Sequence, residues 1–108
     1  MKRVTVGLAT VAAALAFAAP AQADPDTDFT NELHTYGIYG QKDFNAWIGK
    51  ITCKRQRNGV DRDAVASARF IQNQLAKDQS STEQSWQFLA AALRFYCPDK
   101  LPILDQAR

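Results

Sequence analysis

Two cysteines, Cys53 and Cys97, constrain the fold of this chain more than any other feature, because they are its only cysteines. Two cysteines allow a single intramolecular pairing. A metal site would need more ligands than two cysteines and one distant histidine, and a redox motif would hold its cysteines closer together. We therefore predict a structural disulfide, which closes a loop of about 45 residues and contributes about 4 kcal/mol in the chain-entropy model.

The N-terminal segment has the three parts of a secretory signal. Lys2 and Arg3 precede an uncharged stretch, residues 4–19, which is followed by a proline and by the small residues Ala21 and Ala23. The stretch is shorter than the about 20 strongly apolar residues of a transmembrane helix. We predict a signal peptide at residues 1–23, cleavage after Ala23, a single domain at residues 24–108 and no stable transmembrane segment after cleavage. The protein is then secreted or held at the cell envelope, where disulfides persist.

The expected cleavage also changes the net charge. The whole chain carries a formal charge of +2, with 13 basic and 11 acidic residues. Lys2 and Arg3 leave with the signal and no acid does, so the remaining domain is close to neutral. Nothing in this balance points to a nucleic-acid partner.

Apolar residues recur at helical spacing in four segments, at about residues 26–36, 43–58, 61–77 and 80–97. No segment shows sustained two-residue alternation, so we expect no sheet. The fold class predicted is all-α: a small four-helix domain, orthogonal or bundle-like, stapled by one disulfide. We expect Asp43 and Asp61 to cap the second and third helices, and Ser80 and Glu83 to form a capping box at the fourth.

Each segment also predicts which side faces the core. The second segment has a bulky stripe and, away from it, a side of small residues that includes Cys53. We infer that this helix is contacted on two sides, by bulky residues on one side and by close approach of the Cys97 helix on the other. The third has one apolar face, the fourth is apolar over most of its circumference and so is expected to be central, and the tail is expected to fold back. The residues assigned to the core in these segments are Phe44, Trp47, Ile48 and Ile51; Val65, Ala68, Ile71 and Leu75; Trp86, Leu89, Leu93 and Cys97; and Leu101, Ile103 and Leu104.

Two groups of residues are candidates for ligand binding. His34, Tyr36 and Tyr39 are residue types that can hold haem iron, although no defining haem motif accompanies them, so no cofactor is assigned. A second group is a local basic cluster, which could meet anionic lipid headgroups or envelope polymers or could be an ordinary solvated helix end. The cluster consists of Lys50, Lys54, Arg55, Arg57 and Arg62.

The sequence contains little that supports a catalytic function. A hydrolytic triad needs a nucleophile, a base and an orienting group, and His34 has no serine or cysteine signature beside it. The acidic residues gather at helix starts, where the helix dipole already accounts for them. We therefore expect no enzyme activity.

Several stretches resemble a small secreted actinobacterial family, known chiefly from mycobacteria as domain of unknown function 732. They are DTDFTNELHTYGI near the start, Cys53, NGVDRDAV after it, and FLAAALRFYCP from Phe88 to Pro98, the most specific of them. The resemblance implies a short exported helical domain with a cysteine pair, and it adds no catalytic residues because the family has no established activity. The basic CKRQRNG segment departs from the family pattern.

These observations lead to one functional expectation and one alternative. We expect a non-enzymatic, exported helical domain that binds a protein, lipid or polymer of the cell envelope. The alternative is a carrier of a small ligand such as haem. The two differ in that only a carrier requires a deep apolar pocket.

Overall fold

A computed structural model describes residues 24–106 of the chain, and the predicted signal peptide with its cleavage residues Ala21 and Ala23 lies outside them. Within residues 24–106 every regular element is helical, which confirms the all-α prediction. Four long helices are joined and followed by short ones. The elements are α2 (Pro25–His34), α3 (Lys42–Arg57), α4 (Ala64–Gln74), η2 (Lys77–Gln79), α5 (Thr82–Tyr96), η3 (Pro98–Lys100) and α6 (Ile103–Gln106).

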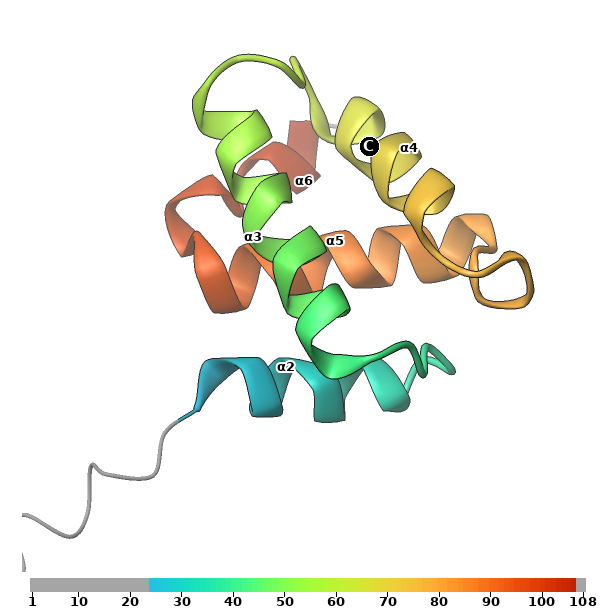
Figure 1. Cartoon of the computed structure of the whole chain (residues 1–108). Helices are drawn as coiled ribbons and strands as arrows, with labels where there is room; N and C mark the ends of the chain where they lie inside the picture. The colour runs from blue at the N-terminus through green and yellow to red at the C-terminus, as the bar shows by residue number, and fades with distance from the viewer. Residues whose placement is uncertain (1–23, 107–108) are drawn as a thin grey trace, which may run out of the picture.

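Helix α5 is the centre of the domain, as its apolar circumference predicts. It contacts α2, α3 and α4, and Figure 1 shows α3 crossing in front of it rather than running alongside it. Phe88, Leu89, Ala92 and Leu93 of α5 have no exposed surface. Phe29 of α2 packs its ring edge-to-face against Phe88, with centroids 5.2 Å apart.

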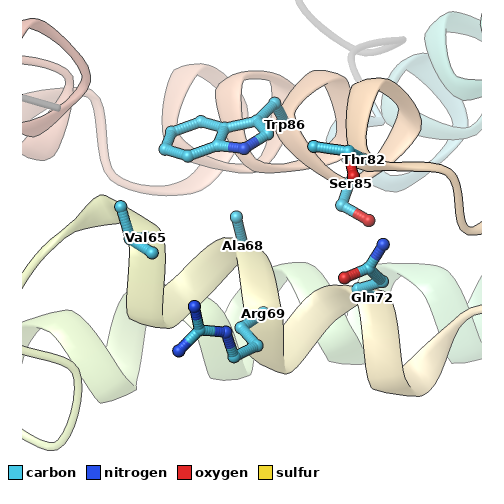
Figure 2. A pocket seen from close by; sticks show the side chains of 7 residues that line it. All are labelled: Val65, Ala68, Arg69, Gln72, Thr82, Ser85 and Trp86. Carbon is cyan, nitrogen blue, oxygen red and sulfur yellow. The ribbon is translucent and has the colours of Figure 1, made fainter. Parts of the chain in front are cut away.

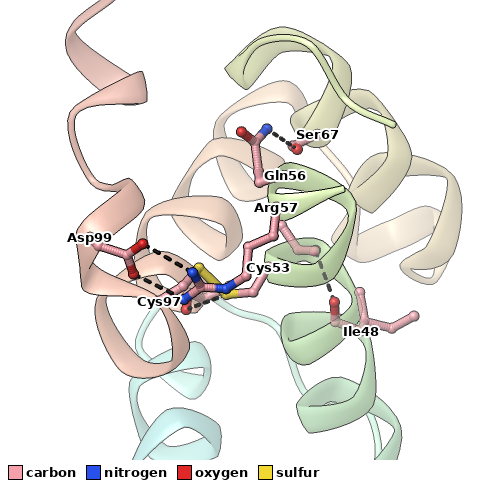
Figure 3. The surroundings of a disulfide bond; sticks show 9 residues. Ile48, Cys53, Gln56, Arg57, Ser67, Cys97 and Asp99 are labelled. Carbon is pink, nitrogen blue, oxygen red and sulfur yellow. Dashed lines mark hydrogen bonds and ion pairs between the residues drawn. A yellow bond between two sulfur atoms is a disulfide. The ribbon is translucent and has the colours of Figure 1, made fainter. Parts of the chain in front are cut away.

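The predicted disulfide is confirmed. Cys53 of α3 is bonded to Cys97, which immediately follows α5 as its C-cap, and their Cα atoms lie 5.9 Å apart (Figure 3). Beside the bond, the Arg57 guanidinium makes two hydrogen bonds of 3.1 and 3.0 Å to the Asp99 carboxylate. The disulfide therefore ties the middle of the chain to the end of the central helix.

Helix α3 is approached on its small side by α5, as predicted, but most of its bulky stripe is not buried as predicted. Ile48 is fully buried, but Phe44 and Trp47 are 39% and 55% exposed. The reason is the small side of the helix: a Cβ atom at Gly49 would lie only 2.9 Å from the Tyr96 ring. Because α5 approaches α3 closely there, the small side takes the core position. Phe44 and Trp47 of the bulky stripe turn outward, whereas Ile48 stays buried.

The starts of three helices also differ from the predicted ones. Asp63 caps α4, where its carboxylate accepts from the Ala66 N–H at 2.9 Å, so the prediction that Asp61 is the cap was wrong. Asp43 does not cap α3 either, since this helix follows Gln41 without a side-chain cap. The capping box of α5 exists, but one residue later than predicted, between Ser81 and Gln84.

The C-terminal tail folds back, as predicted. Leu101, Ile103 and Leu104 pack against the buried core, and α6 contacts α4. In the part of the chain that the structure describes, no helix is long and apolar enough to cross a membrane.

Candidate functional site

In the structure, three members of the basic cluster form ion pairs with three different acidic residues. Lys50 pairs with Asp26 at 3.2 Å, and Arg57 pairs with Asp99. Lys54 and Arg62 are exposed, and neither forms an ion pair within residues 24–106. The cluster therefore carries less net positive charge than its sequence suggests.

Arg55, the remaining member of the cluster, has a structural position. Its guanidinium donates two hydrogen bonds of 2.9 Å to the buried Asp61 carboxylate, and it lies 4.1 Å from the centroid of the Phe70 ring. The Ser67 hydroxyl donates to the same carboxylate at 2.8 Å. The pair links the last turn of α3 to the loop that precedes α4, so the Arg55 side chain is engaged within the fold.

The three candidate haem ligands lie near the end of α2, where His34 and Tyr39 are exposed and Tyr36 is partly buried against the core. The rings of His34 and Tyr39 are 5.4 Å apart, and both side chains are exposed, Tyr39 by 63%. The Tyr36 hydroxyl instead donates to the Glu32 carboxylate at 2.6 Å. Among the described residues, no three His, Cys, Asp or Glu side chains gather as a metal site would require.

Glu32 is the centre of a small charged group between α2 and α5. It accepts from Tyr36 and forms an ion pair with Arg94 of α5. The hydrogen bond from Arg94 lowers the pKa of the Glu32 carboxyl, against the opposing effect of its partial burial. Partial burial raises the pKa of the Tyr36 hydroxyl, and its bond to Glu32 adds to this effect. Both groups are therefore explained by helix packing.

This ion pair makes a prediction for acidic pH. A carboxyl whose pKa is lowered by folding stabilises the folded state above its ordinary value of 4.5 and loses that contribution as the pH falls through the lower value. At pH 7, Glu32→Gln should lower the Tm by a few degrees, because the pair is partly exposed. The difference from wild type should shrink as the pH falls below 4.5 and the Glu32 carboxyl of the folded protein becomes protonated. Glu83→Gln, at an exposed acid, is the control, and a difference that persists unchanged throughout the acid titration would contradict the assignment.

An open cleft of about 210 Å³ lies between α4 and α5 (Figure 2). Its lining consists of Val65, Ala68, Arg69 and Gln72 from α4 and of Thr82, Ser85 and Trp86 from α5. Figure 2 shows the flat face of Trp86 opposite Val65 and Ala68, and the amide of Gln72 directed towards Ser85. The cleft thus has an apolar end and a polar end.

The polar groups of the cleft are only partly used within the fold. Gln72 donates from Nε2 to the Ser80 carbonyl at 2.9 Å, and Ser85 donates to the Ser81 carbonyl at 2.9 Å. Within residues 24–106, the Arg69 guanidinium forms no ion pair. A guanidinium has five N–H donors and no acceptor, so the cleft offers donors to an incoming group.

One known protein family matches nearly all of the residues that the structure describes. The family model described as a protein of unknown function (DUF732) matches residues 25–99. The chain belongs to this family. The matched range of the DUF732 domain contains both cysteines and every residue that lines the cleft.

Two relatives of this DUF732 protein come from Mycobacterium tuberculosis. They are the uncharacterized proteins MT0585, of strain CDC 1551 / Oshkosh, and Rv0559c, of strain ATCC 25618 / H37Rv. Each is 47% identical over 105 residues, which cover 96% of this chain and 91% of the relative. No solved structure matches the chain.

The cleft of this DUF732 domain was not predicted from the sequence. Val65 and Trp86 were both assigned to the core, whereas Val65 is 40% exposed and Trp86 is half-buried. The available signal was the position of Arg69, one helical turn after Val65 on α4. A cation beside an apolar face indicates that the face reaches the surface.

Proposed function

We propose that this protein is an exported, non-enzymatic binding domain that works at the cell envelope or outside the cell, and that the α4–α5 cleft receives a small group of an envelope macromolecule. The observation that carries the proposal is the cleft itself, in which one open space is lined by an indole face, an aliphatic side chain and a guanidinium that forms no ion pair among residues 24–106. Binding sites commonly combine an apolar wall with a few polar groups that fix orientation.

The size of the cleft favours a group attached to a larger molecule. Sites for whole drug-sized ligands and cofactors usually enclose about 300–1,000 Å³ and bury most of the ligand. This cleft is smaller, at about 210 Å³, and it is open. It suits one sugar residue or one side chain of a polymer or protein better than a haem group. His34, Tyr36 and Tyr39 lie outside it, which gives the carrier alternative less support.

The chemistry of the cleft favours a group rich in acceptor oxygens. Arg69 supplies charged donors, and Trp86 supplies a flat apolar face. No carboxylate, histidine or cysteine lines the cleft, so its walls hold none of the usual acid, base or nucleophile side chains apart from the hydroxyls of Thr82 and Ser85. Together these features support binding rather than catalysis.

The fluorescence of Trp86 gives a direct test. The chain has two tryptophans, so Trp47→Phe leaves Trp86 as the sole indole reporter. We expect soluble fragments of a mycobacterial cell wall to change the emission of Trp86 in this variant of residues 24–108. We also expect the protein to be retained on the insoluble wall fraction, and Arg69→Glu to reduce that retention at least tenfold.

Arg62→Glu provides a matched control, because Arg62 is an exposed arginine outside the cleft. It should leave retention unchanged. Equal retention of both charge-reversal variants, or an unchanged Trp86 signal at saturation, would refute the cleft as the site. Titration with haemin belongs in the same series, since a shifted Soret band would support the carrier instead.

A further inference from the structure

The outer side of α3 carries a stripe that no described helix covers. In Figure 1, α3 lies in front of α5, so its outer side faces the viewer. Four residues follow one another along this side at intervals of four, four and three residues, which keeps them on one helix face. We call Asp43, Trp47, Ile51 and Lys54 the α3 stripe.

The middle of the α3 stripe is apolar and aromatic. Trp47 is 55% exposed, and the Phe44 ring beside it lies 6.2 Å from the indole, between centroids. Tryptophan is among the residues most enriched at the energetic centres of protein interfaces. Phe44 and Trp47, which the sequence assigns to the core, are therefore available to a partner.

The ends of the α3 stripe carry opposite charges. Asp43 lies at the start of α3 and Lys54 near its end, and neither forms an ion pair within residues 24–106. Eleven residues separate them, which is about 16 Å along a helix. The neighbouring Lys50 is different, because it turns to Asp26 of α2. Along one helix face, the α3 stripe therefore has an acidic residue, then an aromatic and apolar centre, then a basic residue.

We propose that a second copy of this chain covers the α3 stripe, with the two α3 helices antiparallel about a two-fold axis. This arrangement places Asp43 of each copy opposite Lys54 of the other and brings the two Trp47 side chains together near the axis. A parallel arrangement would oppose like charges at both ends. A two-fold interface uses the same patch on both copies, so a patch whose two ends are complementary suits it.

The dimer should be weak. One 16-residue helix presents a face about 24 Å long, which is at the small end for a specific interface. Even a weak dimer binds a surface more tightly than the monomer does. It presents two α4–α5 clefts, so once one cleft is bound the binding of the second is intramolecular. This inference extends the proposed function but does not depend on it, since self-association is measured without any ligand.

Sedimentation velocity of residues 24–108 tests the proposal. At low ionic strength, the weight-average mass of the oxidised protein should rise from monomer towards dimer as concentration increases to about 1 mM. Trp47→Ser should abolish the rise, and it should fold normally because the side chain is exposed. Asp43→Lys and Lys54→Asp should each weaken the association at least tenfold.

The double variant Asp43→Lys/Lys54→Asp separates this geometry from non-specific association. The swap re-creates both opposite-charge contacts, so it should restore the association to within about threefold of wild type. Asp78→Lys, at an exposed acid in η2, makes the same charge change elsewhere and should have no effect. A wild-type protein that stays monomeric throughout, or a double variant no better than the single ones, would overturn the proposal.

Discussion

Replacing both Cys53 and Cys97 by alanine should lower the free energy of unfolding by about 4 kcal/mol. The bond closes a loop between residues 44 apart in sequence, and its loss enlarges the unfolded ensemble. Small domains have only about 5–15 kcal/mol in total, so the variant should be close to unfolding at 37 °C. Urea denaturation of residues 24–108, followed by far-UV circular dichroism, measures the loss.

Reduction of the wild-type protein is the matched comparison. Both thiols are buried, so the reduced chain keeps the side-chain volume that alanine removes. It should lose most of the same 4 kcal/mol, whereas the alanine variant should lose slightly more because of the small cavities left behind. A loss below about 1 kcal/mol on reduction would mean that helix packing alone holds α3 against α5, and the view of the disulfide as the main staple would fail.

The features that sequence analysis predicted correctly depend on local pattern or on counting. Two cysteines permit one pairing, and the apolar run of α5 is long enough to make it central whatever its neighbours do. In the C-terminal tail, Leu101, Ile103 and Leu104 pack back onto the core, because these apolar side chains can be buried only against the rest of the domain. None of these predictions depends on how two helices pack against each other.

The close approach of α5 to the small side of α3 was predicted, but the exposure of its bulky side could not be obtained in the same way. Its bulky side and its small side both satisfy helical periodicity, and the larger residues give the stronger apolar signal. The deciding fact is tertiary: Tyr96 and Phe29 fill the space beside Gly49, so close helix approach prevails over bulk. Trp47 is exposed for that reason, and the α3 stripe follows from it.

The candidate sites were harder still to predict from sequence. A basic cluster looks continuous along the chain, but its charges reach different acids once the helices are placed. Asp26 and Asp99 lie far from Lys50 and Arg57 in sequence, and only the fold brings them together. The cleft needs two helices in register, because neither Arg69 nor Trp86 indicates a site alone.

Arg55→Met should destabilise the protein by about 3 kcal/mol, the second largest effect that we expect. Methionine keeps an apolar stem against Phe70 but removes both hydrogen bonds to Asp61, whose side chain is only 3% exposed. The cost comes from the carboxylate that stays buried without its cation. Arg55 itself is 31% exposed, which places the effect at the lower end for a broken buried pair.

Arg57→Met is an unusually close control for this prediction. Arg57 makes the same two-pronged contact with Asp99, but both side chains are about half exposed, so its loss should cost much less than the loss of Arg55. Adding Asp61→Ala to Arg55→Met should recover about 2 kcal/mol, because it removes the stranded charge. Urea denaturation of the four proteins compares them directly. Equal losses for the two arginine variants would show that burial of Asp61 does not set the energy of the pair.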